Sequence, residues 1–150
     1  MSSSEATPNA GWNNPDDAEI RAFLATRPVI AMVGASSRAM RPSNGVMAGL
    51  LAEGYDVIPV NPNETEVLGV RAFPDLASIG RRVDLVDVFR RREHLPQVAR
   101  DAVAIGARML WLQLDLVSPE AYRIARDAGM RVVMDQCLIV AHHRLFEWGR

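Results

Sequence analysis

The chain has 150 residues, of which 17 are basic and 18 acidic, with a formal net charge of −1. This length suits a single domain, and the interspersed charges exclude the single-signed surface of a nucleic-acid-binding or membrane-surface protein. The lone cysteine, Cys137, and a start without the basic and apolar regions of a signal peptide predict a reducing, cytoplasmic location. No apolar run approaches the roughly 20 residues of a membrane-spanning helix. Together with the mixed charges, this means that neither a membrane nor a nucleic acid is an expected partner.

The start of the chain differs in composition from the rest, being rich in Ser, Asn, Thr and Pro. Residues 1–14 are predicted to form a flexible tail, and residues 15–150 a single domain. The domain begins with a short helix over 15–27, whose acids lie in its first turn. The apolar runs that follow are too short for helices and predict buried strands at 29–33, 57–60, 83–88, 108–112 and 131–134.

Helical patterns separate most of these strands. Ser43 is predicted to cap a helix that ends at Gly54, a second helix covers 95–105, and Ser118 caps a third that ends at Gly129. The crossover between the second and third strands has no strong helix, and residues 67–70 are expected to form a small excursion there. The alternation predicts an α/β fold: a doubly wound, mainly parallel sheet of five or six strands with helices on both faces.

Ligands of doubly wound sheets bind outside the carboxyl ends of the strands, so we expect the site among the loops that follow them. The first such loop joins Gly34, which permits a tight turn, to the start of a helix. Free main-chain N–H groups and the positive helix end there suit a phosphate, with Arg38 and Arg41 adding charge. The same residues would also serve a plain turn with solvated arginines.

Polar and aromatic groups follow the other strands as well. The Asn61–Pro62 pair stands where an NAD site would have an acid for the ribose hydroxyls. A dinucleotide is therefore the weaker choice, although Glu64 comes shortly afterwards. Phe89 and the cations Arg90, Arg91 and Arg92 suit the adenine and phosphates of a nucleotide, but they would equally suit a core ring and cations that neutralise nearby acids.

Several segments, taken together and in order, resemble the small coenzyme A-binding proteins of bacteria and archaea. Those proteins are similar to the CoA-binding domain of succinyl-CoA synthetase alpha subunits. The resemblance implies a Rossmann-like fold with coenzyme A across the carboxyl edge of the sheet. One departure is Gln136, which stands where the family motif Asp-Arg-Cys has a cation. The matching segments are 30–36 with 41–43, 54–62, 86–90, 105–107 with 111–113, and 132–137.

The resemblance also implies which residues bind the ligand. It places the Gly34–Ser37 turn at the phosphates, the Asn61–Pro62 loop beside the nucleotide, and 88–90 at the adenine and ribose. Arg41 is our own assignment for a phosphate contact, because coenzyme A carries both a diphosphate and a 3′-phosphate. The complete predicted site is Gly34, Ala35, Ser36, Ser37, Arg38, Arg41, Ser43, Asn61, Pro62, Val88, Phe89, Arg90 and Gln113.

No catalytic constellation and no metal site is predicted. Asp84 and Asp87 stand three apart in one strand and so point to opposite faces. His142 and His143 are interpreted as structural, because adjacent residues rarely offer both rings to one ion. Cys137 has the chemistry of a reactive thiol, but a small buried hydrophobe at a strand end is the favoured interpretation.

The leading hypothesis is a non-catalytic protein that binds coenzyme A or acyl-CoA and senses, stores or presents it. An NAD(P)-binding oxidoreductase and a separated fragment of an acyl-CoA ligase are the enzymatic alternatives, and a scaffold with a vestigial site is the third. Besides the ligand, the expected partner is an unknown protein or a second copy of the chain in a homo-oligomer.

Overall fold

The computed structural model describes residues 12–147. Its main sheet has five strands, all parallel, in the spatial order β2-β1-β5-β6-β7. The order reverses between β1 and β5: the chain continues from β1 to β2 on one side of this point and from β5 to β6 and β7 on the other. The predicted α/β fold is confirmed as a Rossmann-like, doubly wound sheet. The strands are β1 (Ile30–Val33), β2 (Val57–Val60), β5 (Leu85–Val88), β6 (Met109–Leu112) and β7 (Arg131–Val133).

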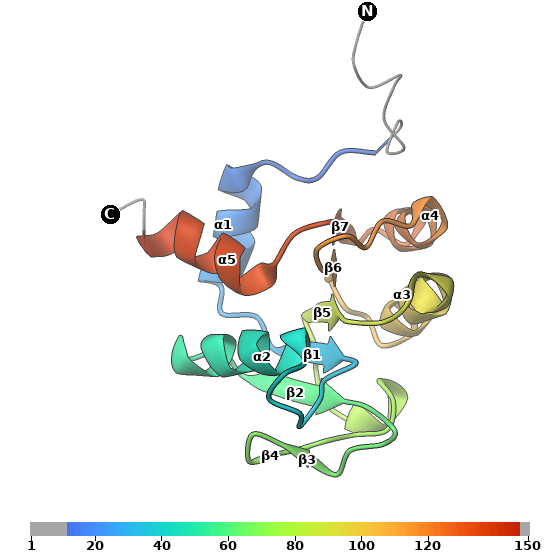
Figure 1. Ribbon diagram of the computed structural model, residues 1–150. Coiled ribbons are helices and arrows are strands. Elements are labelled where there is room, and N and C mark those ends of the chain that lie inside the picture. The colour runs from blue at the N-terminus through green and yellow to red at the C-terminus, as the bar shows by residue number, and fades with distance from the viewer. Residues whose placement is uncertain (1–11, 148–150) are drawn as a thin grey trace, which may run out of the picture.

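Within residues 12–147, five α-helices cover the two faces of this sheet. On one side lie α1 (Asp17–Ala25), α2 (Pro42–Ala52) and α5 (Leu138–His142), and on the other α3 (Leu95–Ala104) and α4 (Pro119–Asp127) (Figure 1). The strands are buried on both faces because alternate residues serve different cores. In β1, Ile30 and Met32 pack with α1 and α2, whereas Ala31 and Val33 pack with α3 and α4.

The helix ends agree with their predicted caps in one case and differ in another. The Ser118 hydroxyl accepts the main-chain N–H of Ala121 at 3.1 Å, as expected for the cap of α4. The prediction for α2 is wrong, because Arg41 is the N-cap and Ser43 lies inside the helix, only 3% exposed. Pro42 explains the difference: its fixed φ suits the first helical position, so the helix begins before Ser43.

The crossover from β2 to β5 contains the predicted excursion, a small antiparallel hairpin of β3 (Glu66–Val67) and β4 (Val70–Arg71). Its two turn residues, Leu68 and Gly69, both have positive φ, which is typical of a tight two-residue hairpin turn. A short 3₁₀ turn over Ala77–Ile79 then leads back to the sheet.

Residues 1–11 of the predicted tail lie outside the described residues. In the remainder of that segment, Trp12 packs against the core on the α3 and α4 side. The Asn14 side chain donates to the carbonyl of Met134 at 3.0 Å and accepts its N–H at 2.8 Å. Asn14 therefore pairs with the main chain just beyond β7. Among residues 12–147, no helix has the length and apolar character to cross a membrane.

Candidate functional site

A cavity of about 1120 Å³ opens at the carboxyl edge of the sheet. Its wall comes from the loops after β1 and β2, the start of α2, and the segments that follow β5, β6 and β7. The loops after β1 and β5 flank the point where the strand order reverses, which is where doubly wound folds bind their ligands. The fold thus places this cavity at its expected binding position.

At Gly34, the loop after β1 lies against the main chain that follows β5. This glycine has a φ of +89°, and a Cβ atom there would lie 2.0 Å from the carbonyl oxygen of Phe89. The N–H of Phe89 donates to Val33 at 2.8 Å, and the N–H of Gly34 donates to Val60 at 2.9 Å, so three strand ends meet here. Only glycine permits both this conformation and this close approach.

Side-chain amides hold the rest of the loop after β1 in place. Asn61 donates to the carbonyl of Ala35 at 2.8 Å, and Asn44, in the first turn of α2, donates to the carbonyl of Ser36 at 3.0 Å. The Ser36 hydroxyl accepts the N–H of Arg38 at 3.1 Å. Because side chains from outside the loop bind the carbonyls of Ala35 and Ser36, the loop is held next to the start of α2.

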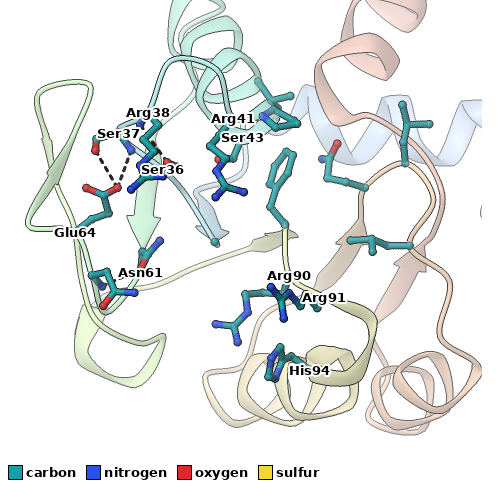
Figure 2. A pocket seen from close by; sticks show the side chains of 18 of the residues that line it. Ser36, Ser37, Arg38, Arg41, Ser43, Asn61, Glu64, Arg90, Arg91 and His94 are labelled. Atoms are coloured by element: carbon teal, nitrogen blue, oxygen red, sulfur yellow. Dashed lines mark hydrogen bonds between the residues drawn. The ribbon is translucent and has the colours of Figure 1, made fainter.

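The loop already binds one anionic group, which belongs to the protein itself. The Glu64 carboxylate accepts the main-chain N–H of Ser37 at 2.8 Å and its hydroxyl at 2.9 Å (Figure 2). These hydrogen bonds lower the pKa of Glu64, because they favour its charged form. The contact shows that the Ser37 donors are arranged for an oxyanion.

Four arginines and a histidine line the cavity from two directions. Figure 2 shows Arg38 and Arg41 on one side, and Arg90, Arg91 and His94, which follow β5, on the other. None of the ion pairs among residues 12–147 involves these four arginines. Guanidinium groups that enter a cavity from two sides suit a ligand with more than one phosphate.

A buried carboxyl lies at the end of β5 beside this cavity. Asp87 is fully buried, and its Oδ1 accepts a hydrogen bond from the side-chain amide of Gln113, which lines the cavity. Burial raises the pKa of Asp87 to about 7, against the opposing effect of the hydrogen bonds from Gln113 and the main chain of Val88. Asp84 lies before the strand, where it accepts the N–H of Val29 at 2.9 Å.

Residues 28–143 match the model of a protein family described as the CoA binding domain. The chain belongs to this family. The identification made from the sequence segments is confirmed, and the cavity described above is that of a CoA-binding-domain protein.

Known relatives share both sequence and structure with this CoA-binding domain. The chain is 43% identical over 129 residues to the uncharacterized protein YneT of Bacillus subtilis, covering 86% of this chain and 96% of that one. A hypothetical protein from Pyrococcus horikoshii has a solved structure with a TM-score of 0.85 at 37% identity, covering 87% of this chain and 92% of that one. An acetate–CoA ligase (ADP-forming) of Archaeoglobus fulgidus is 23% identical over an alignment of 120 residues that covers 73% of this chain but only 18% of the ligase.

Most of the residues predicted for the site lie together on the wall of this cavity. The exceptions are Ala35 and Val88, both completely buried, whose side chains pack in the two cores. At these two positions only main-chain atoms are available to a ligand. The residues brought together are Gly34, Ser36, Ser37, Arg38, Arg41, Ser43, Asn61, Pro62, Phe89, Arg90 and Gln113.

The domain also brings residues to the cavity that the predicted site lacked. The additional polar and apolar groups are Asn63, Glu64, Arg91, His94, Leu114, Asp115, Leu116 and Cys137, with Pro42 and Val46 from α2. The interpretation of Cys137 as a buried hydrophobe holds only in part: the residue packs against the core, but it is partly exposed and lies on the wall as the N-cap of α5. The available signal was its place in the segment between the last strand and the helix that follows it. Among residues 12–147, no group of three or more potential ligands could hold a metal ion.

Proposed function

We propose that this domain binds coenzyme A or an acyl-CoA in the cavity between the β1 and β5 loops. The observation that carries the proposal is that two pairs of arginines, Arg38 with Arg41 and Arg90 with Arg91, line the same cavity as Ser36 and Ser37. The nucleotide half of coenzyme A bears a diphosphate and a 3′-phosphate, and a ligand of that charge requires several cations from more than one direction. Membership of the CoA binding domain family supports the same ligand.

Within the cavity, the Gly34–Ser37 turn and the start of α2 are assigned to the diphosphate. A helix N-terminus with free N–H groups is a favourable position for an anion, and Arg38 and Arg41 add full charges there. The Asn61–Pro62 loop is assigned to the side of the nucleotide, and Phe89 with Arg90 to adenine and ribose. Phe89 is partly exposed and lines the cavity, which supports a stacking role.

We further propose that the protein acts in the cytoplasm as a carrier or sensor of coenzyme A and not as an enzyme. The relative YneT supports a function of the domain by itself, because the match covers 96% of that protein. A protein partner or a second copy of the chain would then receive the ligand or the signal. On this view, residues 15–150 form the binding unit and the segment before them takes no part.

Calorimetric titration with a panel of nucleotides tests the proposed ligand. Coenzyme A should bind saturably, dephospho-CoA should bind more weakly because it lacks the 3′-phosphate, and ATP, NAD and NADP should bind more weakly still. Equal affinity for coenzyme A and dephospho-CoA would remove the role given to the arginines. A nicotinamide dinucleotide that binds more tightly than coenzyme A would favour the oxidoreductase alternative instead.

A second candidate function is that of a ligase component. It is favoured by the match to a region that makes up only 18% of the acetate–CoA ligase. A chain of this kind would need a partner that supplies the remaining parts of a ligase. Purification from its native source with a larger chain, and thioester formation by the complex but not by this domain alone, would support this candidate over a free-standing carrier.

A further inference from the structure

The side-chain amide of Gln113 is held in one orientation on the cavity wall. Gln113 follows β6 and is 5% exposed, and its Nε2 donates to the carboxyl of Asp87. Since the amide nitrogen is the atom that faces Asp87, the side-chain oxygen of Gln113 points away from this carboxyl. No hydrogen bond among residues 12–147 reaches the Gln113 side-chain oxygen. The polar atom that this amide leaves available is therefore an acceptor.

Asp87 is an unusual residue to bury for structural reasons alone. Its register partners on the neighbouring strands are Met32 and Trp111, and its second carboxyl oxygen, Oδ2, is buried with no hydrogen-bond partner. A carboxyl group in such surroundings destabilises the fold unless it is fully hydrogen-bonded. Its retention at the end of β5 is explained if its task is to orient Gln113.

The wall around Gln113 differs in character from the arginine-rich side. Leu114, Leu116 and Cys137 line the cavity there, with Asp115 as the charged residue of this part. The chain before Cys137 is tied to the end of β6, because Trp111 donates to the carbonyl of Gln136 at 2.8 Å. Coenzyme A has two halves of matching character: an anionic nucleotide and a neutral pantetheine arm with two amides, a hydroxyl and a thiol.

We propose that Gln113, oriented by Asp87, accepts a hydrogen bond from an amide N–H or the hydroxyl of the pantetheine arm. This assignment depends on the proposed function and goes beyond it by fixing the direction of the ligand. The phosphates lie among the arginines, and the arm runs past Gln113 toward Leu114 and Cys137. Gln113 is then a residue that selects coenzyme A over nucleotides without the arm, and Asp87 is its positioning residue.

Calorimetry with two ligands tests this assignment. Coenzyme A carries the arm, whereas adenosine 3′,5′-bisphosphate has the nucleotide and two of the phosphates but no arm. Gln113→Met keeps the length of the side chain and removes the acceptor. This substitution should weaken the binding of coenzyme A about tenfold, since one hydrogen bond is lost and its donor on the ligand stays unpaired. The affinity for the bisphosphate should not change. Gln97→Met, on the exposed face of α3, is the matched control and should change neither affinity.

Two substitutions of Asp87 separate positioning from support of the fold. Asp87→Asn keeps an oxygen that can accept from Gln113 and should bind coenzyme A within about threefold of the wild type. Asp87→Val removes the acceptor and should show the same selective loss as Gln113→Met. Equal losses for both ligands, or no loss for coenzyme A in Gln113→Met, would overturn the assignment. If the wild-type chain binds neither ligand, the proposed function itself fails.

Discussion

The Glu64 carboxylate occupies the main-chain and side-chain donors of Ser37, at 2.8 and 2.9 Å. An anionic ligand phosphate would compete for these donors and would be repelled by the same carboxylate. Glu64→Gln is therefore expected to tighten the binding of coenzyme A about fivefold. Calorimetry of the variant at fixed ionic strength checks this. Weaker binding would mean that Glu64 itself contacts the ligand, as the acid of a ribose site does, and would favour a dinucleotide.

Removal of a cavity arginine should weaken the binding of coenzyme A without altering the fold. Arg41→Ala is expected to cost about 1–3 kcal/mol of binding free energy, because a charged hydrogen bond to phosphate is lost. The loss should be larger at low salt, where screening is weaker. Arg123→Ala removes the same charge from the exposed surface of α4 and should leave the affinity unchanged. Equal effects of the two variants would argue against a phosphate contact at Arg41.

Substitution of Gly34 should damage both stability and binding. Even a methyl group would lie 2.0 Å from the carbonyl oxygen of Phe89, at a φ of +89°. Gly34→Ala is expected to cost at least about 3 kcal/mol in the free energy of unfolding, and Gly34→Val more. Gly45→Ala in α2 is the control, because a Cβ there meets nothing within 4 Å. It should raise stability by about 0.5–1 kcal/mol, which chemical denaturation can resolve.

The buried carboxyl of Asp87 should make stability fall as the pH rises. Its pKa is about 7 in the folded chain against an ordinary value of 3.8, so between these values the folded state holds a proton that the unfolded state has lost. The free energy of unfolding therefore falls as the pH rises from about 3.8 to about 7, and above that range the loss is up to about 4 kcal/mol.

Asp87→Asn removes this titration and should stabilise the protein more at about pH 8 than at about pH 5. Urea denaturation of variant and wild type at both pH values measures the difference. Asp56→Asn is the matched control, because Asp56 is half-exposed and pairs with Arg81 at 2.9 Å. A stabilisation by Asp87→Asn that is the same at both pH values would show that the carboxyl is not protonated in the folded state.

Bound coenzyme A should protect Cys137 from alkylation. Cys137 is the single cysteine of the chain and lies partly exposed on the cavity wall, so labelling by iodoacetamide reports on this site alone. Mass spectrometry of the labelled protein should show slower modification with coenzyme A than with adenosine 3′,5′-bisphosphate, which does not reach this side of the cavity. Equal rates with both ligands would place the thiol of coenzyme A elsewhere.

Local sequence patterns were sufficient for the sheet and most of its helices. The run 29–33 is apolar at every position, which is typical of a strand buried on both faces, and Ser118 followed by Pro119 is a strong helix start. These signals succeed because burial and capping act over a few neighbouring residues. The same reasoning failed at Ser43, where the conformation imposed by Pro42 has priority over a serine cap.

The sequence alone also indicated that polar groups gather at the strand ends, and the family segments named a ligand for them. Tertiary structure decided how those groups meet. Gln113, after β6, donates a hydrogen bond to Asp87 on the neighbouring strand β5. Ser37 donates to Glu64 of another loop, and Gly34 lies against Phe89. Each pair joins residues more than two dozen positions apart, and their contacts depend on strand order and register, which the whole core sets at once.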